Sequence, residues 1–276
     1  MKERILLFCI VFGLGVFIYI FQSYFNTVWG LAILCFLMSL YVGFMNLSYK
    51  LQKRKLQKYP QVINENYKPF VSVLIPAHDE ECVIANTVQN ILDMDYENFE
   101  VIVIDDRSVD NTASVIKDLE QKYDKVTALI RPKDAFPGKS AVLNDAFKIA
   151  KGEAILVFDA DATVDADFLT TLIPHLEPKD VGAVQARKVI RNKNTNLLTR
   201  CQNNEYTLDT YFQVGRDSVK GAVELRGNGE LIKRQAIEDI GGWNNYTIVD
   251  DLDMSTRMHI KGWDIRFCPD AIVYEE

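Results

Sequence analysis

The chain has 276 residues, a formal net charge of −7 and 48% hydrophobic residues. With 25% charged and 11% aromatic residues it has the composition of a folded protein, which excludes an intrinsically disordered chain. Residues 1–60 carry seven Lys or Arg and one acid, whereas residues 61–276 carry a net charge of −13. An acidic domain of this kind argues against a nucleic-acid partner, because phosphates need Lys and Arg.

Two apolar runs occupy the N-terminal region. Ile5–Phe21 and Val28–Leu47 contain no charged residue, and each is long enough to cross a hydrocarbon core of ~30 Å. Basic residues precede the first run and follow the second, so the positive-inside rule places both ends in the cytoplasm. The pattern predicts a two-helix transmembrane hairpin over residues 1–59 with a basic cytoplasmic flank, and a multi-pass protein of the cell membrane. A cleaved signal peptide is the alternative, but no small-residue cleavage site follows the first run.

The five cysteines are scattered and odd in number, which is typical neither of a disulfide framework nor of a zinc site. We therefore expect the part of the chain after the hairpin to lie in a reducing compartment.

From residue 60 onward, apolar β-rich runs alternate with amphipathic stretches. The predicted strands are residues 71–75, 101–105, 126–130 and 154–158, and the predicted helices between them are 82–92, 111–122 and 139–151. This alternation predicts an α/β fold with a mostly parallel, Rossmann-like sheet and helices on both faces. After residue 180 the pattern is weaker, and predicts a strand over 181–189 and helices over 196–214, 236–240 and 251–260.

Acidic side chains follow three of the predicted strands, at residues 79–81, 105–106 and 159–161. Ligands of open α/β sheets bind beyond the carboxyl ends of the strands, so we expect these acids to meet at one site. Asp159 and Asp161 are two residues apart at a strand end and face the same way. Two hard carboxylate ligands suit Mg²⁺ or Mn²⁺.

Five motifs along the chain together resemble those of the family 2 glycosyltransferases. The motifs are Val71–Glu80, Val103–Ser108, Gly138–Asn144, Phe158–Asp161 and Val249–Asp253. The closer resemblance is to the membrane-bound processive branch, which contains the cellulose, chitin, hyaluronan and poly-N-acetylglucosamine synthases. It implies a GT-A fold over residues 60–276, with a nucleotide-binding half at 60–162 and an acceptor half at 163–276.

The resemblance also implies a role for individual residues. Asp251 would be the general base, and Asp159 and Asp161 would hold the metal ion. The residues implied in donor binding are Pro76, Ala77, Asp79, Glu80, Asp105, Asp106, Lys139, Asn144 and Asp159. The residues implied on the acceptor side are Gly227, Asn228, Asp250 and Trp243. For the Gly227 loop a simple turn, and for Trp243 a place in the core, are the structural alternatives.

The reaction implied is an inverting transfer of glucose or N-acetylglucosamine from a UDP-sugar, with Mg²⁺ or Mn²⁺. The acceptor would be a saccharide or a lipid-linked molecule at the cytoplasmic membrane face, and the product would carry a β-glycosidic bond. The partners implied are the donor, the acceptor, the lipid bilayer and a partner membrane subunit.

One motif of the processive branch does not occur in this sequence. That branch has Gln-x-x-Arg-Trp after the base, and we expect this chain to be truncated before that segment. Processive synthesis and a single transfer to a lipid acceptor therefore both stay open.

Two other functions fit parts of the sequence. Phe158–Thr163 matches the Asp-x-Asp-x-Thr motif of haloacid-dehalogenase-like phosphatases, in which Asp159 would be the nucleophile. Alternatively, the chain is a membrane-tethered module that binds a UDP-sugar without turnover.

Overall fold

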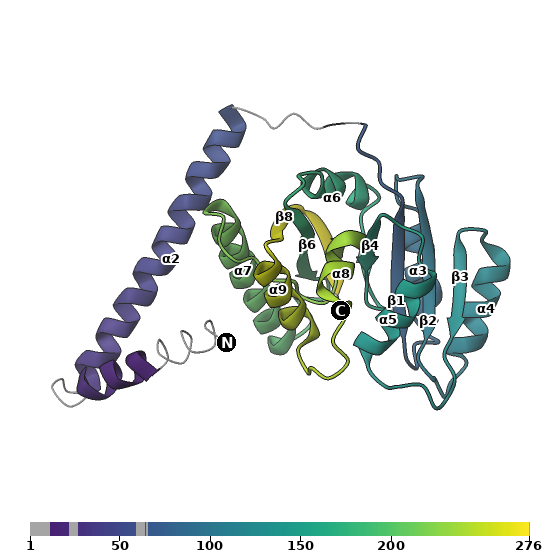
Figure 1. The fold of residues 1–276 in the computed structure, drawn as a ribbon, viewed down its shortest axis with the longest axis horizontal. Coiled ribbons are helices and arrows are strands. Elements are labelled where there is room, and N and C mark those ends of the chain that lie inside the picture. The colour runs from purple at the N-terminus through teal and green to yellow at the C-terminus, as the bar shows by residue number, and fades with distance from the viewer. Residues whose placement is uncertain (1–11, 22–26, 59–63, 65, 276) are drawn as a thin grey trace.

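The computed structural model describes residues 12–21, 27–58, 64 and 66–275 (Figure 1). Within these residues one helix, α2 (Thr27–Lys58), contains a segment long and apolar enough to span a membrane, Trp29–Arg54. The apolar helix before it, Phe12–Phe21, is shorter than a span requires. Residues 5–11 of the first predicted span lie outside the described residues. The structure therefore supports one membrane helix, and the two-helix hairpin is not confirmed.

The rest of the chain forms one eight-stranded sheet in the order β3-β2-β1-β4-β7-β6-β8-β5. The strands are β1 (Val71–Ala77), β2 (Phe99–Asp105), β3 (Val126–Ile130), β4 (Ala154–Val157), β5 (Thr163–Val164), β6 (Val181–Ile190), β7 (Glu230–Lys233) and β8 (Asp264–Glu275).

The first four strands of this order are parallel, as predicted. The prediction of a mostly parallel sheet is too simple for the second half. Strand β7 runs antiparallel to both β4 and β6, β8 runs parallel to β6, and β5 runs antiparallel to β8. The sheet is therefore mixed, and β7 joins the two predicted halves of the domain into one continuous sheet.

Helices cover both faces of this sheet, as predicted. They are α3 (Ile84–Leu92), α4 (Thr112–Lys122), α5 (Lys139–Ile149), α6 (Phe168–Leu176), α7 (Leu197–Ser218), α8 (Arg234–Ile240) and α9 (Asp250–Lys261). Because side chains alternate along a strand, Val73 and Ile75 of β1 pack with α3, α4 and α6, whereas Leu74 packs with α5, α7, α8 and α9. The sheet thus has a separate hydrophobic core on each face.

Helix α2 is attached to the domain through α7, which lies beside it (Figure 1). The rings of Tyr41 and Phe212 stack with their centroids 6.1 Å apart. Nearer the C-terminal end of each helix, Gly215 leaves room for Met45: a Cβ atom on Gly215 would lie 2.6 Å from the Met45 Cβ.

Candidate active site

A cavity of about 380 Å³ opens at the carboxyl ends of β1, β2 and β4, the position expected for an α/β sheet. It brings together seven of the predicted site residues, which are Pro76, Ala77, Glu80, Asp106, Lys139, Asp159 and Asp161. His78, Val142 and Ala160 also line it. His78 was not among the predicted residues, although its position directly after β1 was a signal for it. We call this cavity the donor cleft.

Lys139 connects the donor cleft to the loop before β7. Its Nζ donates to Asp159 Oδ1 at 2.5 Å and to the carbonyl oxygen of Gly227 at 2.7 Å. Burial disfavours the charged ammonium, but the Asp159 and Glu230 carboxylates outweigh it and raise the pKa of Lys139. The lysine therefore stays positively charged inside the cleft, where a diphosphate would find a fixed cation.

Three carboxylates lie near one another on the opposite side of the cleft. The pKa of Glu80 is raised, first by burial and then by the negative charge of Asp161 and other acids including Asp159. Neither Asp159 nor Asp161 belongs to a described cluster of three or more His, Cys, Asp or Glu side chains arranged to hold a metal. Two hard oxygen ligands beside uncompensated negative charge fit a Mg²⁺ or Mn²⁺ ion that completes its shell with water and phosphate oxygens.

Asp106 lies on the floor of the donor cleft and is held by two arginines. Its Oδ1 accepts from Arg131 Nη1 at 2.6 Å and from Arg107 Nε at 2.8 Å. Burial opposes ionisation, yet these two guanidinium groups lower the pKa of Asp106. Asp105 is equally buried but does not line the cleft, and its Oδ1 has no hydrogen-bond partner among the described residues. Only the second member of the predicted pair thus faces the donor cleft.

Asp79 has its side chain committed elsewhere. Its backbone is left-handed, with φ of 57°, and its Oδ1 accepts from the backbone N–H of Val109 at 2.7 Å. This carboxylate holds the loop after β2 rather than lining the cleft.

Asn144 and Trp243 also lie outside the donor cleft. The Asn144 side chain accepts from the backbone N–H of Trp243 at 3.0 Å and donates to its carbonyl oxygen at 2.7 Å. The Trp243 indole is buried and meets the Phe147 ring edge-on, with centroids 6.0 Å apart. Asn144 is therefore a clamp on the chain before α9, and the structure places Trp243 in the core.

The loop Gly227–Gly229 enters β7 and lies between the donor cleft and the start of α9. Asn228 is fully buried, and its Oδ1 accepts from the backbone N–H of Asp159 at 3.2 Å. A Cβ atom on Gly227 would lie 3.7 Å from Lys139 Nζ and 3.8 Å from Asp251 Oδ2. The predicted base and the predicted diphosphate-binding lysine thus approach the same glycine, so the predicted donor and acceptor sides adjoin.

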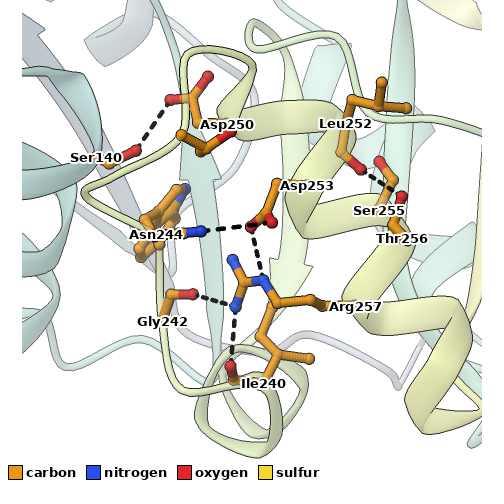
Figure 2. A network of polar contacts seen from close by, with 12 residues as sticks. Ser140, Ile240, Gly242, Asn244, Asp250, Leu252, Asp253, Ser255, Thr256 and Arg257 are labelled. Atoms are coloured by element: carbon orange, nitrogen blue, oxygen red, sulfur yellow. Dashed lines mark hydrogen bonds and ion pairs between the residues drawn. The ribbon is translucent and has the colours of Figure 1, made fainter. Parts of the chain in front are cut away.

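Helix α9 begins at Asp250 and Asp251, and its first turns are fixed by polar contacts (Figure 2). Asp250 Oδ2 accepts from Ser140 Oγ at 3.4 Å. Deeper along α9, Arg257 pairs with Asp253 at 2.7 Å and donates to the carbonyl oxygens of Ile240 and Gly242. These contacts tie the loop before α9 to the helix and hold Asp251 next to the cleft.

Glu230 is a site residue that sequence reasoning missed. It lies buried in β7, and its Oε1 accepts from the backbone N–H of Gly227 at 2.5 Å. Burial raises its pKa to about 7, and the nearby Asp250 and Asp251 act in the same direction. A carboxylate inside the short apolar segment Glu230–Ile232 was the one signal available in the sequence.

The chain resembles proteins that transfer sugars. It is 44% identical over 210 residues to a beta-monoglucosyldiacylglycerol synthase of Nostoc sp., covering 75% of this chain and 45% of that protein. It is 31% identical over 222 residues to a poly-beta-1,6-N-acetyl-D-glucosamine synthase of Staphylococcus aureus, covering 79% of this chain and 52% of that protein. The chain thus spans about half the length of the curated relatives it matches.

Among solved structures, the chain superposes on the mannosyltransferase PcManGT from Pyrobaculum calidifontis in complex with GDP-Man and Mn²⁺. The TM-score is 0.67 at 26% sequence identity, over 88% of this chain and 68% of that chain. The model of the glycosyltransferase-like family 2 matches residues 69–276, which is the whole sheet with its covering helices. The chain therefore belongs to glycosyltransferase family 2.

Proposed function

We propose that this chain is the donor-binding and base-bearing part of an inverting glycosyltransferase. It transfers glucose from UDP-glucose to a diacylglycerol-type lipid at the cytoplasmic face of the cell membrane. The observation that carries the proposal is the convergence of Lys139, Asp159 and Asp161 in one cleft, with Asp251 beside it. The glucose and the lipid are taken from the 44% identical relative, whose printed name is a glucosyldiacylglycerol synthase.

In the donor complex, the nucleotide lies against the carboxyl ends of β1 and β2, with Asp106 beneath it. Lys139 faces the diphosphate, because it is the positive side chain held inside the cleft. Asp159 and Asp161 would hold the divalent cation, which would neutralise charge on the diphosphate leaving group.

Asp251 is the proposed general base. It takes the proton from the acceptor hydroxyl as that oxygen attacks the anomeric carbon from the side opposite the diphosphate. A single in-line displacement of this kind converts an α-linked donor into a β-linked product. The position of Asp251 on the first turn of α9, which Asp250, Asp253 and Arg257 hold, keeps it next to the donor cleft.

A lipid acceptor suits the attachment of the domain to α2. The membrane helix packs on α7, so the domain lies where an acceptor can reach it from the bilayer. A saccharide acceptor, as the name of the 31% identical synthase suggests, is the second candidate. The phosphatase alternative has lost its basis, because the family match covers the entire domain.

The test is glycolipid formation by the full chain reconstituted in vesicles that contain diacylglycerol. UDP-glucose, UDP-N-acetylglucosamine and GDP-mannose are supplied in turn with Mn²⁺ or Mg²⁺, and lipid products are measured by mass spectrometry. We expect a glucosylated lipid from UDP-glucose, reduced about a hundredfold or more by Asp251→Asn, since a general base contributes at least that much. The matched control is Asp253→Asn on the same helix, which breaks the pair with Arg257 and leaves Asp251 in place.

Each other outcome has a definite meaning. Unchanged product with Asp251→Asn would remove that residue as the base. Metal-dependent UDP binding without any product would leave the module that binds a UDP-sugar without turnover. Product only on a saccharide acceptor would replace the lipid in the proposal.

A further inference from the structure

The first turn of α7 presents two large apolar side chains to the outside of the domain. Leu197 is 76% exposed and Leu198 is 67% exposed. The turn is firmly fixed by a capping box, in which Asn196 Oδ1 accepts from the Thr199 backbone N–H at 3.0 Å and Thr199 Oγ1 accepts from that of Asn196 at 3.2 Å. The fold therefore holds both leucines in place without burying them.

These leucines begin an apolar stripe that runs along α7 to the membrane helix. Leu208 and Tyr211 are each about half exposed. At 100° per residue, Leu197, Leu208, Tyr211 and Gly215 fall on one side of the helix. Helix α2 covers the far end of this stripe, at Phe212 and Gly215, and leaves the end near Leu197 uncovered.

The direction of α7 relative to α2 points its first turn toward the bilayer. Tyr41 of α2 contacts Phe212, and Met45 contacts Gly215, so the two helices run in the same direction. Moving from Gly215 back to Leu197 therefore follows α2 from its basic end toward its apolar span (Figure 1).

The segment around the leucines is basic in an otherwise acidic domain. Residues 181–204 contain five Lys or Arg and no acid. Lys188 is paired with Glu275 at 2.8 Å. Arg191, Lys193 and Arg200 are exposed, and none of the three belongs to an ion pair among the residues that the structure describes. Exposed cations beside exposed leucines form a surface that attracts anionic lipid headgroups and inserts apolar side chains.

We propose that the start of α7 is a second membrane contact, which docks on the anionic surface of the bilayer. Leu197 and Leu198 enter the headgroup boundary, while Arg191, Lys193 and Arg200 pair with lipid phosphates. Together with α2, this contact holds the domain at two points and fixes its orientation on the membrane. The inference uses the assignment of α2 as a membrane span and does not use the transferase activity.

The test is photo-crosslinking of the full chain in vesicles with traceable lipids. The photoreactive residue p-benzoylphenylalanine replaces Leu197, or Phe36 as the positive control, or Lys117 as the negative control. Phe36 is exposed on α2, and Lys117 is exposed on α4 at the opposite end of the sheet. The vesicles contain phosphatidylcholine alone or mixed with phosphatidylglycerol.

We expect lipid adducts at positions 197 and 36 and almost none at 117. The adducts at 197 increase when phosphatidylglycerol is present and decrease with added salt. Arg200→Gln lowers the phosphatidylglycerol-dependent binding by about fivefold, the effect of one basic residue at an anionic surface. Glu205→Gln, a neutralisation of opposite sign one turn further along α7, does not lower it.

Lipid adducts at 36 without adducts at 197 would overturn the proposal while leaving α2 as a span. A crosslinked dimer at 197 in place of lipid would show that a second copy covers the stripe. Equal labelling in both kinds of vesicle would overturn the part assigned to the basic residues.

Discussion

At the scale of single residues, the donor cleft depends on one buried cation among several acids. Lys139 balances Asp159 directly, whereas Glu230 lies beneath the Gly227 loop with its charge balanced only by more distant groups. The site is therefore arranged to hold negative charge at a cost, which a metal ion and a donor relieve when bound.

Glu230 makes the stability of the domain depend on pH. Burial raises its pKa from 4.5 to about 7, so the folded state keeps a proton that the unfolded state releases. The contribution of Glu230 to stability is therefore greatest below pH 4.5, falls as the pH rises to about 7 and is constant above that. Glu230→Gln keeps an acceptor for Gly227 and removes the charge. We expect this variant to be more stable than the wild type at high pH, by about 1–3 kcal/mol, and equal to it at acid pH.

The measurement is chemical denaturation of both proteins across this pH range. Glu238→Gln is the matched control, because Glu238 is an exposed carboxylate on the next helix. A difference between wild type and Glu230→Gln that does not change with pH would contradict the account.

Sequence reasoning at this scale succeeded where a motif follows a strand directly. Asp159, Asp161 and Lys139 were predicted in this way, and all three line the cleft. It could not foresee that Asn144 clamps Trp243, because these residues are 99 positions apart and meet only in the folded chain. Likewise Asp79 is next to the cleft in sequence but turns its carboxylate to Val109.

At the scale of elements, continuous apolar strands were predicted well and irregular ones were not. Strands β1 to β4 were each recognised from an unbroken β-rich run. Strand β8 was not, since Pro269 and Asp270 interrupt its pattern, and the structure accommodates them at a register shift opposite Ala186 and Arg187. Strand β7 is only four residues long and carries a buried acid, so its apolar signal was too short.

The contact between α2 and α7 depends on the absence of a side chain at Gly215. A Cβ atom there would lie 2.6 Å from Met45 Cβ, so Gly215→Ala forces the helices apart. We expect a loss of about 1–3 kcal/mol, the range for overpacking a close contact. The measurement is thermal unfolding of the full chain in detergent, and Gly43→Ala is the control because its Cβ would meet nothing within 4 Å. Equal midpoints for the two variants would mean that the helices do not pack as described.

At the scale of the whole molecule, the membrane helix and the catalytic sheet form one unit joined through α7. The charge division in the sequence predicted a membrane-associated N-terminal part and an acidic domain, and both are present. The number of spans could not be decided from the same signal, because the first apolar run is barely long enough and only its second part is described. The mixed half of the sheet escaped prediction for a related reason: antiparallel pairing depends on the path of the chain rather than on local composition.

The central claim is that the cleft between β1, β2 and β4 binds a nucleoside diphosphate together with a divalent cation. The most direct test is calorimetric titration of the full chain in detergent micelles with UDP, in the presence of Mn²⁺ or of a chelator. We predict binding that requires the metal and that Asp161→Ala weakens by about tenfold or more, the effect of losing a charged ligand. Asp251→Asn should bind UDP like the wild type, because the base acts on the acceptor. UDP binding that is equally strong with a chelator and in Asp161→Ala would contradict the account.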